Sequence, residues 1–242
     1  MQSPDFGLLI NTLIDRKAAE TAGPIPCVVV AVDLPKSRCD VRPLISTLYQ
    51  DDTYDERPIV MGVPIVWPTA GRSAMTFPIR VGDTVMCIPA EVNMDQFKAG
   101  NGQPFPPDDH RRSSEQDYIA VPGLAPFAKS VNNPVIRNWE HNVNDFVISH
   151  NLSTGDEVEI RLTESGEVYI NSKHKVHLKA EHIELESETM AINVGQTTWK
   201  GNISHTGNYT MTGVATFNGI NFATHKHLGV TPGNGVSGIA TA

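Results

Sequence analysis

The chain has 242 residues, and its 19 glycines and 17 prolines accompany an apolar fraction of only 40 %. This composition is typical of strands joined by tight turns and is poor in helix formers. The formal net charge of −8 disfavours a general nucleic-acid binder, which needs excess Lys and Arg to displace counterions. We expect neither a membrane-spanning helix, because no apolar run approaches about 20 residues, nor a signal peptide at the N-terminus.

The three cysteines, Cys27, Cys39 and Cys87, are odd in number and form no C-x-x-C pair. This usage predicts free thiols in a chain that folds in a reducing cytosol. We expect the thiols to be buried and to act as small apolar side chains.

Residues 1–22 contain the one segment with a clear helical pattern. Ser3, Pro4 and Asp5 supply an N-cap, a proline at the first helical position and a first-turn acid. Apolar residues then follow at helical spacing in one stripe: Phe6, Leu9, Ile10, Leu13 and Ile14. The sequence leaves open whether this stripe packs on its own domain or on a partner.

Residues 23–145 have the pattern of a small β domain. The β-branched run at 26–33 predicts one strand. Residues 80–88 contain a Gly-Asp turn followed by an apolar run, which predicts a second strand. Prolines between these runs interrupt the chain every few residues, which is typical of bends and sheet edges. We predict a five-stranded barrel that resembles the OB fold.

Residues 146–222 alternate apolar and polar side chains in short runs without a helix. Val158, Ile160 and Leu162 form one run, and similar runs recur as far as Val194. Each run buries only one face, so we expect these strands to stack around a shared axis as a stem.

Glycine recurs at positions 201, 207, 213 and 219 and divides residues 201–224 into four hexads. Because six is even, odd-numbered positions share one face of an extended chain. This face carries Ile203, Tyr209 and Phe217, so we expect it to point inward, with glycine where chains crowd. A single-chain β-helix needs about three hexads per coil, so four hexads make too short a core. The repeat therefore predicts an intertwined trimeric β-helix, a triangular prism about a three-fold axis.

The tip, residues 223–242, carries a candidate metal site. We expect the odd-face register to continue without interruption through residues 224–227. His225 and His227 then fall on the inward face, so three chains supply six imidazole nitrogens at one level. Six nitrogens suit an octahedral ion, and because zinc prefers four ligands we expect one iron ion per trimer. Residues 201–242 hold a single charged side chain, Lys226. Such a segment suits entry into lipid, although a Gly/Thr-rich stretch can also stay soluble without charges.

The leading OB-like domain, the β-helical stem and the run from Thr224 to Gly229 before a glycine-rich cap resemble the membrane-piercing central spike of contractile-tailed bacteriophages. The resemblance implies a homotrimer at the baseplate tip of the virion, assembled in the host cytoplasm. It implies barrels docked on the baseplate hub and a pointed tip stapled by iron through His225 and His227. Contraction of the tail sheath would drive this tip through the bacterial outer membrane.

Two alternatives fit less well. His174 and His177 have a metal-like spacing on a helix, but an odd offset in a strand sends the two rings to opposite faces. The main rival function is a β-helical polysaccharide-degrading or glycan-binding tail protein, which as an enzyme needs clustered carboxylates. The available acids mix both faces of a strand: Glu181, Glu184, Glu186 and Glu188. We therefore predict that the protein is not an enzyme.

Overall fold

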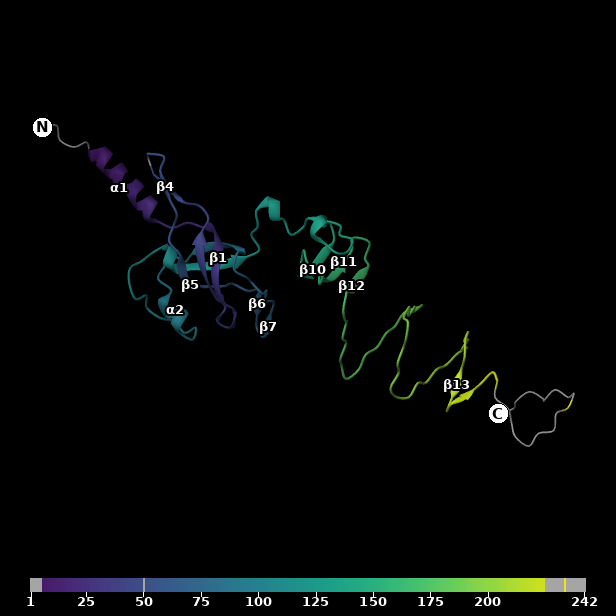
Figure 1. Cartoon of the computed structure of the whole chain (residues 1–242). Coiled ribbons are helices and arrows are strands. Elements are labelled where there is room, and N and C mark those ends of the chain that lie inside the picture. The colour runs from purple at the N-terminus through teal and green to yellow at the C-terminus, as the bar shows by residue number, and fades with distance from the viewer. Residues whose placement is uncertain (1–5, 50, 225–232, 234–242) are drawn as a thin grey trace. The chain divides into compact units, whose positions relative to one another are not determined.

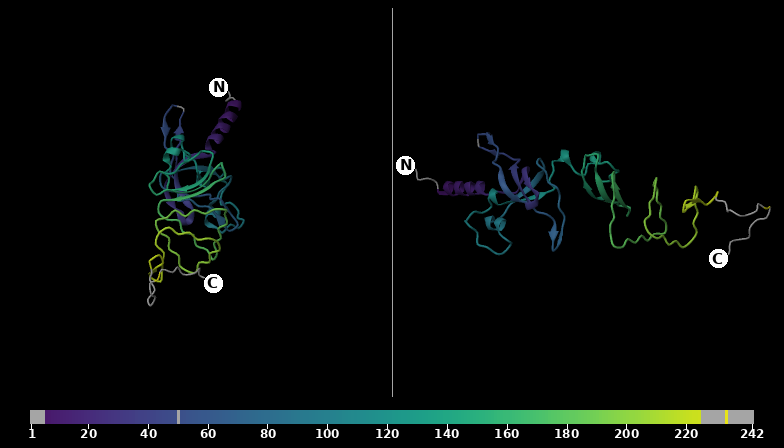
Figure 2. Two further views of the ribbon diagram at one scale, coloured as in Figure 1. Left: turned by 90° about the vertical axis from the view of Figure 1, so that its right-hand side faces the viewer. Right: turned by 60° about the horizontal axis from the view of Figure 1, so that its bottom comes forward.

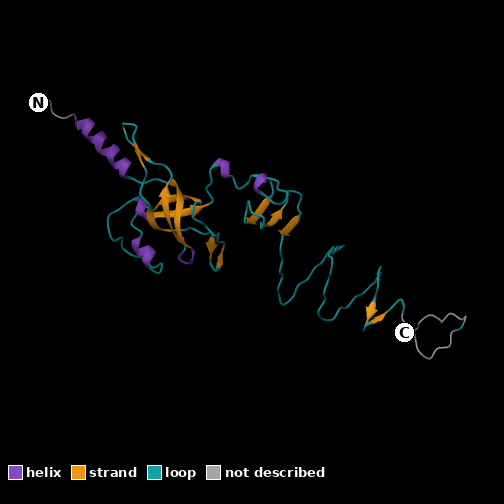
Figure 3. Ribbon diagram, in the orientation of Figure 1, coloured by secondary structure: helices purple, strands orange, loops and turns teal. Residues whose placement is uncertain are grey.

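The computed structural model describes residues 6–49, 51–224 and 233. The chain divides into two units, Met1–Leu178 and Lys179–Ala242, which are described separately (Figure 1). Strands predominate over helices, which confirms the predicted all-β class (Figure 3). None of the helices within the described ranges combines the length and the apolarity that crossing a bilayer requires.

The elements of the described chain are short. The helices are α1 (Phe6–Glu20) and α2 (Asp95–Ala99), with 3-10 turns η1 (Leu34–Lys36), η2 (Glu115–Asp117), η3 (Phe127–Lys129) and η4 (Pro134–Ile136). The strands of the first half are β1 (Ile25–Asp33), β2 (Arg38–Pro43), β3 (Thr47–Leu48), β4 (Tyr54–Asp55), β5 (Val60–Pro64), β6 (Thr69–Ala70), β7 (Ser73–Ala74), β8 (Thr84–Pro89) and β9 (Tyr118–Pro122). The later strands are β10 (Phe146–His150), β11 (Val158–Leu162), β12 (Val168–Ser172), β13 (Thr216–Phe217) and β14 (Ile220–Asn221).

Helix α1 confirms the predicted helix, although its proposed cap at residues 3–5 lies outside the described residues. All five side chains of the predicted apolar stripe are exposed: Phe6, Leu9, Ile10, Leu13 and Ile14. The described part of the chain therefore does not cover this stripe.

Five antiparallel strands form a curled half-barrel in the order β5-β2-β1-β8-β9 (Figures 1 and 2). Strands β1 and β8 occupy the two predicted strand segments. The two edge strands approach each other, because Ile65 bridges Ala120 and the Val66 N–H donates to the Ala120 carbonyl at 2.9 Å. A register shift between Val29 and Ala31 in β1 adds local curvature.

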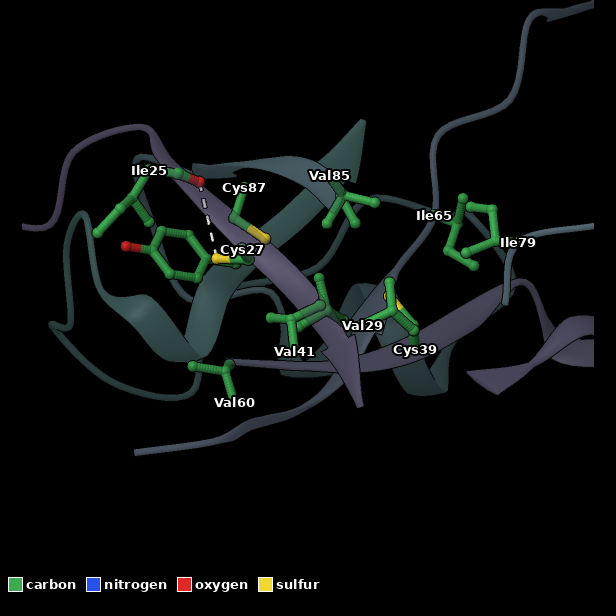
Figure 4. Close-up of a cluster of buried hydrophobic side chains, with 13 residues drawn as sticks. Ile25, Cys27, Val29, Cys39, Val41, Val60, Ile65, Ile79, Val85 and Cys87 are labelled. Atoms are coloured by element: carbon green, nitrogen blue, oxygen red, sulfur yellow. Dashed lines mark hydrogen bonds between the residues drawn. The ribbon is translucent and has the colours of Figure 1, made fainter. Parts of the chain in front are cut away.

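The core lies inside this curl (Figure 4). Val29, Val41, Val63 and Val85 are almost fully buried, and they alternate with more exposed neighbours as half-buried strands require. All three cysteines are free and buried in the same cluster, as predicted.

Burial changes the chemistry of these thiols. Loss of solvation raises the pKa of Cys39 to about 11. The pKa of Cys87 is raised by a hydrogen bond with Cys27 and by burial. The Cys27 thiol also contacts the Ile25 carbonyl at 3.6 Å (Figure 4).

A buried carboxylate ties the loop between β8 and β9 to the barrel. Asp117 is fully buried and accepts two hydrogen bonds from Arg111, at 2.7 and 3.0 Å, and one from the Met94 N–H at 2.9 Å. Arg111 also donates to Asp95 at 3.0 Å. Because Asp95 begins α2, this one guanidinium holds α2 against the start of β9.

Strands β10, β11 and β12 form a separate antiparallel sheet. Its register places Ile148, Ile160 and Ile170 in one row across the three strands. Phe146, Leu162 and Val168 form the next row on the same face.

The predicted strands between residues 173 and 215 are not formed within one chain, where the structure describes neither helix nor strand (Figure 3). The hexad repeat is nevertheless a repeat of backbone geometry, because Gly201, Gly207 and Gly213 have φ values of 124°, 124° and 127°. L side chains rarely adopt such angles. A Cβ at Gly201 or Gly213 would meet no atom within 4 Å. Within the described chain, the backbone conformation therefore requires glycine at these positions, and the crowding expected between chains stays a prediction.

The odd-face register was predicted to continue without a break to Thr224, and this is wrong in the single chain. Strands β13 and β14 form a hairpin whose turn residues Asn218 and Gly219 have φ values of 48° and 81°. Asn-Gly is the preferred sequence for a two-residue turn with both φ angles positive. The hairpin reverses the chain and packs Phe217 edge-on against Phe222.

We predict that the three thiols are inert in the native protein and react only after unfolding. With a pKa of about 11, Cys39 is a thiolate in on the order of one molecule in a thousand at about pH 8, and all three sulfurs are buried. A chromogenic thiol reagent should detect no thiols in native protein and three per chain in denaturant. Rapid labelling of Cys39 in native protein would contradict this.

We also predict that acid destabilises the barrel through Asp117. Burial favours its neutral form, but hydrogen bonds from Arg111 and the Met94 N–H outweigh this and lower the pKa of Asp117. Its contribution is therefore complete above the unfolded-state pKa of about 4 and is lost as the pH falls further. Asp117→Asn should cost about 1–3 kcal/mol at neutral pH, because it weakens the hydrogen bonds of a buried group, and it should weaken the acid dependence. Thermal unfolding of both proteins at several pH values between neutral and acidic measures the loss of stability and its pH dependence. If the stability of the variant falls with pH as steeply as that of wild type, Asp117 is not the source of the acid sensitivity.

Candidate interface of the stem sheet

One face of the β10–β11–β12 sheet carries charged side chains, and this is the buried face. Glu159 and Arg161 on β11, with Glu157 just before it, are between 0 and 7 % exposed. Ser149 and Asn171 flank Glu159 on the neighbouring strands. Asn171 donates to the Glu159 carboxylate at 2.9 Å.

Residues 131–145, here called the strap, supply the cover for this polar face. Arg137 lies 3.6 Å from the Glu157 carboxylate and donates to the Ser149 hydroxyl. The Asn138 N–H donates to Glu157 at 2.7 Å, and the Ser153 N–H donates to the Ile136 carbonyl at 3.1 Å. Paired charges and backbone hydrogen bonds therefore hold the strap on this face.

A second ion pair fixes the end of the strap. Arg161 lies 3.3 Å from the Asp145 carboxylate and 3.8 Å from Glu159, and its guanidinium stacks 4.6 Å from the ring centre of Tyr169. The other Asp145 oxygen accepts from the Glu164 N–H at 3.1 Å. Both charged partners are almost completely buried, so separating them would leave a charge without a partner at a substantial cost.

The opposite face of the sheet is apolar and exposed. Its side chains are between 37 and 64 % exposed: Phe146, Ile148, Val158, Ile160, Leu162, Val168 and Ile170. His150 and Ser172 lie beside Val158 in the last row. This arrangement inverts the usual pattern, in which an antiparallel sheet buries its apolar face and exposes its polar face. A contiguous exposed apolar face of this kind marks an interaction surface.

Alternation in the sequence correctly predicted strands β11 and β12 and the sharing of one face by their apolar residues, but it did not single out β10. It did not predict which face the chain itself covers. The signal that was missed is the charge on the alternate positions of β11 together with Arg137 and Asp145 in the preceding segment. Paired charges of this kind indicate a covered polar face.

The predicted metal ligands His225 and His227 lie outside the described residues. Within the described ranges, no group of three or more His, Cys, Asp or Glu side chains is placed to hold a metal ion. His174 instead contacts the Asp156 carboxylate at 2.9 Å on the surface, and His177 is also exposed. The four stem acids, Glu181, Glu184, Glu186 and Glu188, are exposed as well.

Comparison with known proteins supplies independent information about the barrel. Residues 25–123 match the family described as phage protein Gp138 N-terminal domain. The matched segment runs from the first residue of β1 to just beyond the end of β9, and it is less than half of the chain. No curated protein matches the chain. The family match, together with the all-β architecture, supports a bacteriophage structural protein, a component of the virion.

Proposed function

We propose that this chain is the membrane-piercing central spike of a contractile phage tail. In this proposal three copies form one spike, which docks on the baseplate hub and is driven through the bacterial outer membrane when the tail contracts. The observation that carries the proposal is the stem sheet, whose polar face is buried and whose apolar face is exposed. The family match to the barrel domain adds the phage context.

A three-fold assembly solves the physical problem of the apolar face. One sheet per chain forms one wall of a triangular prism, and the seven apolar side chains of each wall then meet inside it. Each buried Ile, Leu, Val or Phe contributes about 1.5–3 kcal/mol. The strap already covers the other face, so the prism has a polar exterior.

The stretch after β12 supports the same assembly. Ile192, Ile203, Tyr209 and other large apolar side chains are exposed, and no strand ladder among the described residues covers them. Backbone N–H and C=O groups without ladder partners favour strand pairing with another chain. The same glycine backbone conformation recurs every six residues and divides each chain into segments of equal length. Stacked coils built from three chains require such equal segments.

The proposed iron site at the tip rests on the chemistry of its two histidines. Two imidazoles per chain, His225 and His227, give six nitrogens in a trimer, and an iron ion bound by all six holds three chain ends together. Such an ion has no open position for substrate or water, so its role is structural.

Helix α1 supports the docking role. A 15-residue helix is marginally stable alone, and its apolar stripe is exposed in the chain. We assign this stripe to the contact with the baseplate hub.

The first test of the assembly is its mass. We expect light scattering to give about three times 26.4 kDa for wild type, because the apolar face of β10–β12 needs partners. Ile160→Asp should lower the trimer content at least tenfold, because it places a charge in the centre of that face. Met61→Asp is the matched control, since Met61 is 74 % exposed on β5 of the barrel and its change should leave the trimer intact. A monodisperse wild-type monomer would end the proposal.

The second test is the metal content. Elemental analysis should find about one third of an iron atom per chain, because three chains share one ion. Changing both His225→Ala and His227→Ala should abolish this content while the mass remains that of a trimer, since the stem face does not depend on the ion. A full metal ion per chain, or metal content unchanged in the double variant, would contradict the shared site.

A further inference from the structure

An apolar pocket of about 540 Å³ opens at the point where the chain leaves the barrel. Its lining includes Val85 of β8 and Ile79, together with Leu124 and Val131 from the segment after β9. The Thr84 hydroxyl donates to the Leu124 carbonyl, which joins two of the lining segments. The pocket is lined mostly by apolar side chains, and no other described part of the chain fills it.

A large apolar side chain projects from the segment that borders this pocket. Phe127 is completely exposed, although Ala125 before it and Lys129 after it both line the pocket. Phe127 begins the 3-10 turn η3, which is closed by the Lys129 N–H donating to the Pro126 carbonyl at 2.8 Å. Pro126 further limits the backbone of this turn. The Phe127 ring is therefore exposed and does not line the pocket of its own chain.

The pocket is also linked to the stem sheet. The Val131 carbonyl, at the pocket edge, accepts from Arg137 at 2.8 Å. The same guanidinium donates to Ser149 of β10 and pairs with Glu157. Pocket, strap and stem sheet are thus joined by a continuous set of contacts in each chain.

We propose that Phe127 of each copy inserts into the pocket of the neighbouring copy. This rests on the proposed trimer. A chain that carries both an apolar projection and a separate apolar pocket forms head-to-tail contacts, and these close into a ring when the rotation is that of a three-fold axis. The interlock fixes the barrels to one another at the top of the stem, where thrust from the hub passes into the spike.

A cross-linking experiment tests the neighbour's identity. Phe127→Cys is combined with Phe77→Cys, because Phe77 lines the pocket and is 46 % exposed, and the trimer is treated with a short bifunctional maleimide. The native thiols are buried and do not compete. We expect covalent dimers and trimers on a denaturing gel. Phe127→Cys with Leu48→Cys is the control, since Leu48 is exposed on β3 away from the pocket, and it should give only monomers.

A truncation provides a second readout. Phe127 has no packing contact to lose within its own chain, so Phe127→Ala should be neutral in a monomer. In the interlocked trimer it should speed dissociation by about tenfold, as truncation of an anchoring aromatic does. Phe97→Ala on α2 is the matched control and should leave dissociation unchanged.

The outcomes separate the two proposals. If wild type has the mass of a trimer but the cysteine pair gives no chain-to-chain product, the interlock is wrong and the spike assembly stands. Cross-linking confined within one chain likewise overturns the interlock. If wild type is a monomer, the proposed function itself fails.

Discussion

The buried pairs Arg137–Glu157 and Arg161–Asp145 hold the strap against one face of the β10–β11–β12 sheet. Charges taken out of water are tolerated only when they are paired and hydrogen-bonded. Once these pairs form, the polar face is closed and the strap has no freedom to cover the other side. The apolar face is then left for a partner, and the proposed trimer depends on this choice.

The barrel and the stem sheet use the same alternation of apolar and polar residues with opposite results. In the barrel the sheet curls until Ile65 meets Ala120, so Val29 and Val85 pack inside their own chain. The stem sheet has only three strands, in the order β10-β11-β12, and the strap covers its polar face. Ile148 and Ile160 of the stem sheet therefore remain exposed. We infer that the barrel folds within one chain and that the stem becomes stable on assembly.

A mechanical role is consistent with this division. Force transmission needs a rigid connection between the part that is pushed and the part that penetrates. The salt-bridged strap joins the linker after β9 to the stem sheet by Arg137 and its contacts with Val131 and Ser149. The hexads beyond it repeat one backbone conformation at Gly201, Gly207 and Gly213. Each feature, taken within its own unit, suits the proposed spike.

The extent of sequence-based prediction differs along the chain for physical reasons. The α1 stripe, strands β1 and β8, and the alternation at 158–162 were predictable because local periodicity reflects local geometry. The same periodicity led us to expect a register without interruption to Thr224. It missed the Asn218–Gly219 hairpin, because a strong turn signal competes with an extended repeat.

The candidate interface shows where the sequence alone is insufficient. The local sequence of residues 146–170 is enough to determine that each strand has one apolar face, because side chains alternate across a strand. Only the tertiary structure decided that this face stays open, since that depends on contacts between residues distant in sequence. Arg137 reaches Glu157 across 20 positions, and Asp145 reaches Arg161 across 16. No local pattern encodes these ion pairs, yet they determine which side of the sheet is left for another chain.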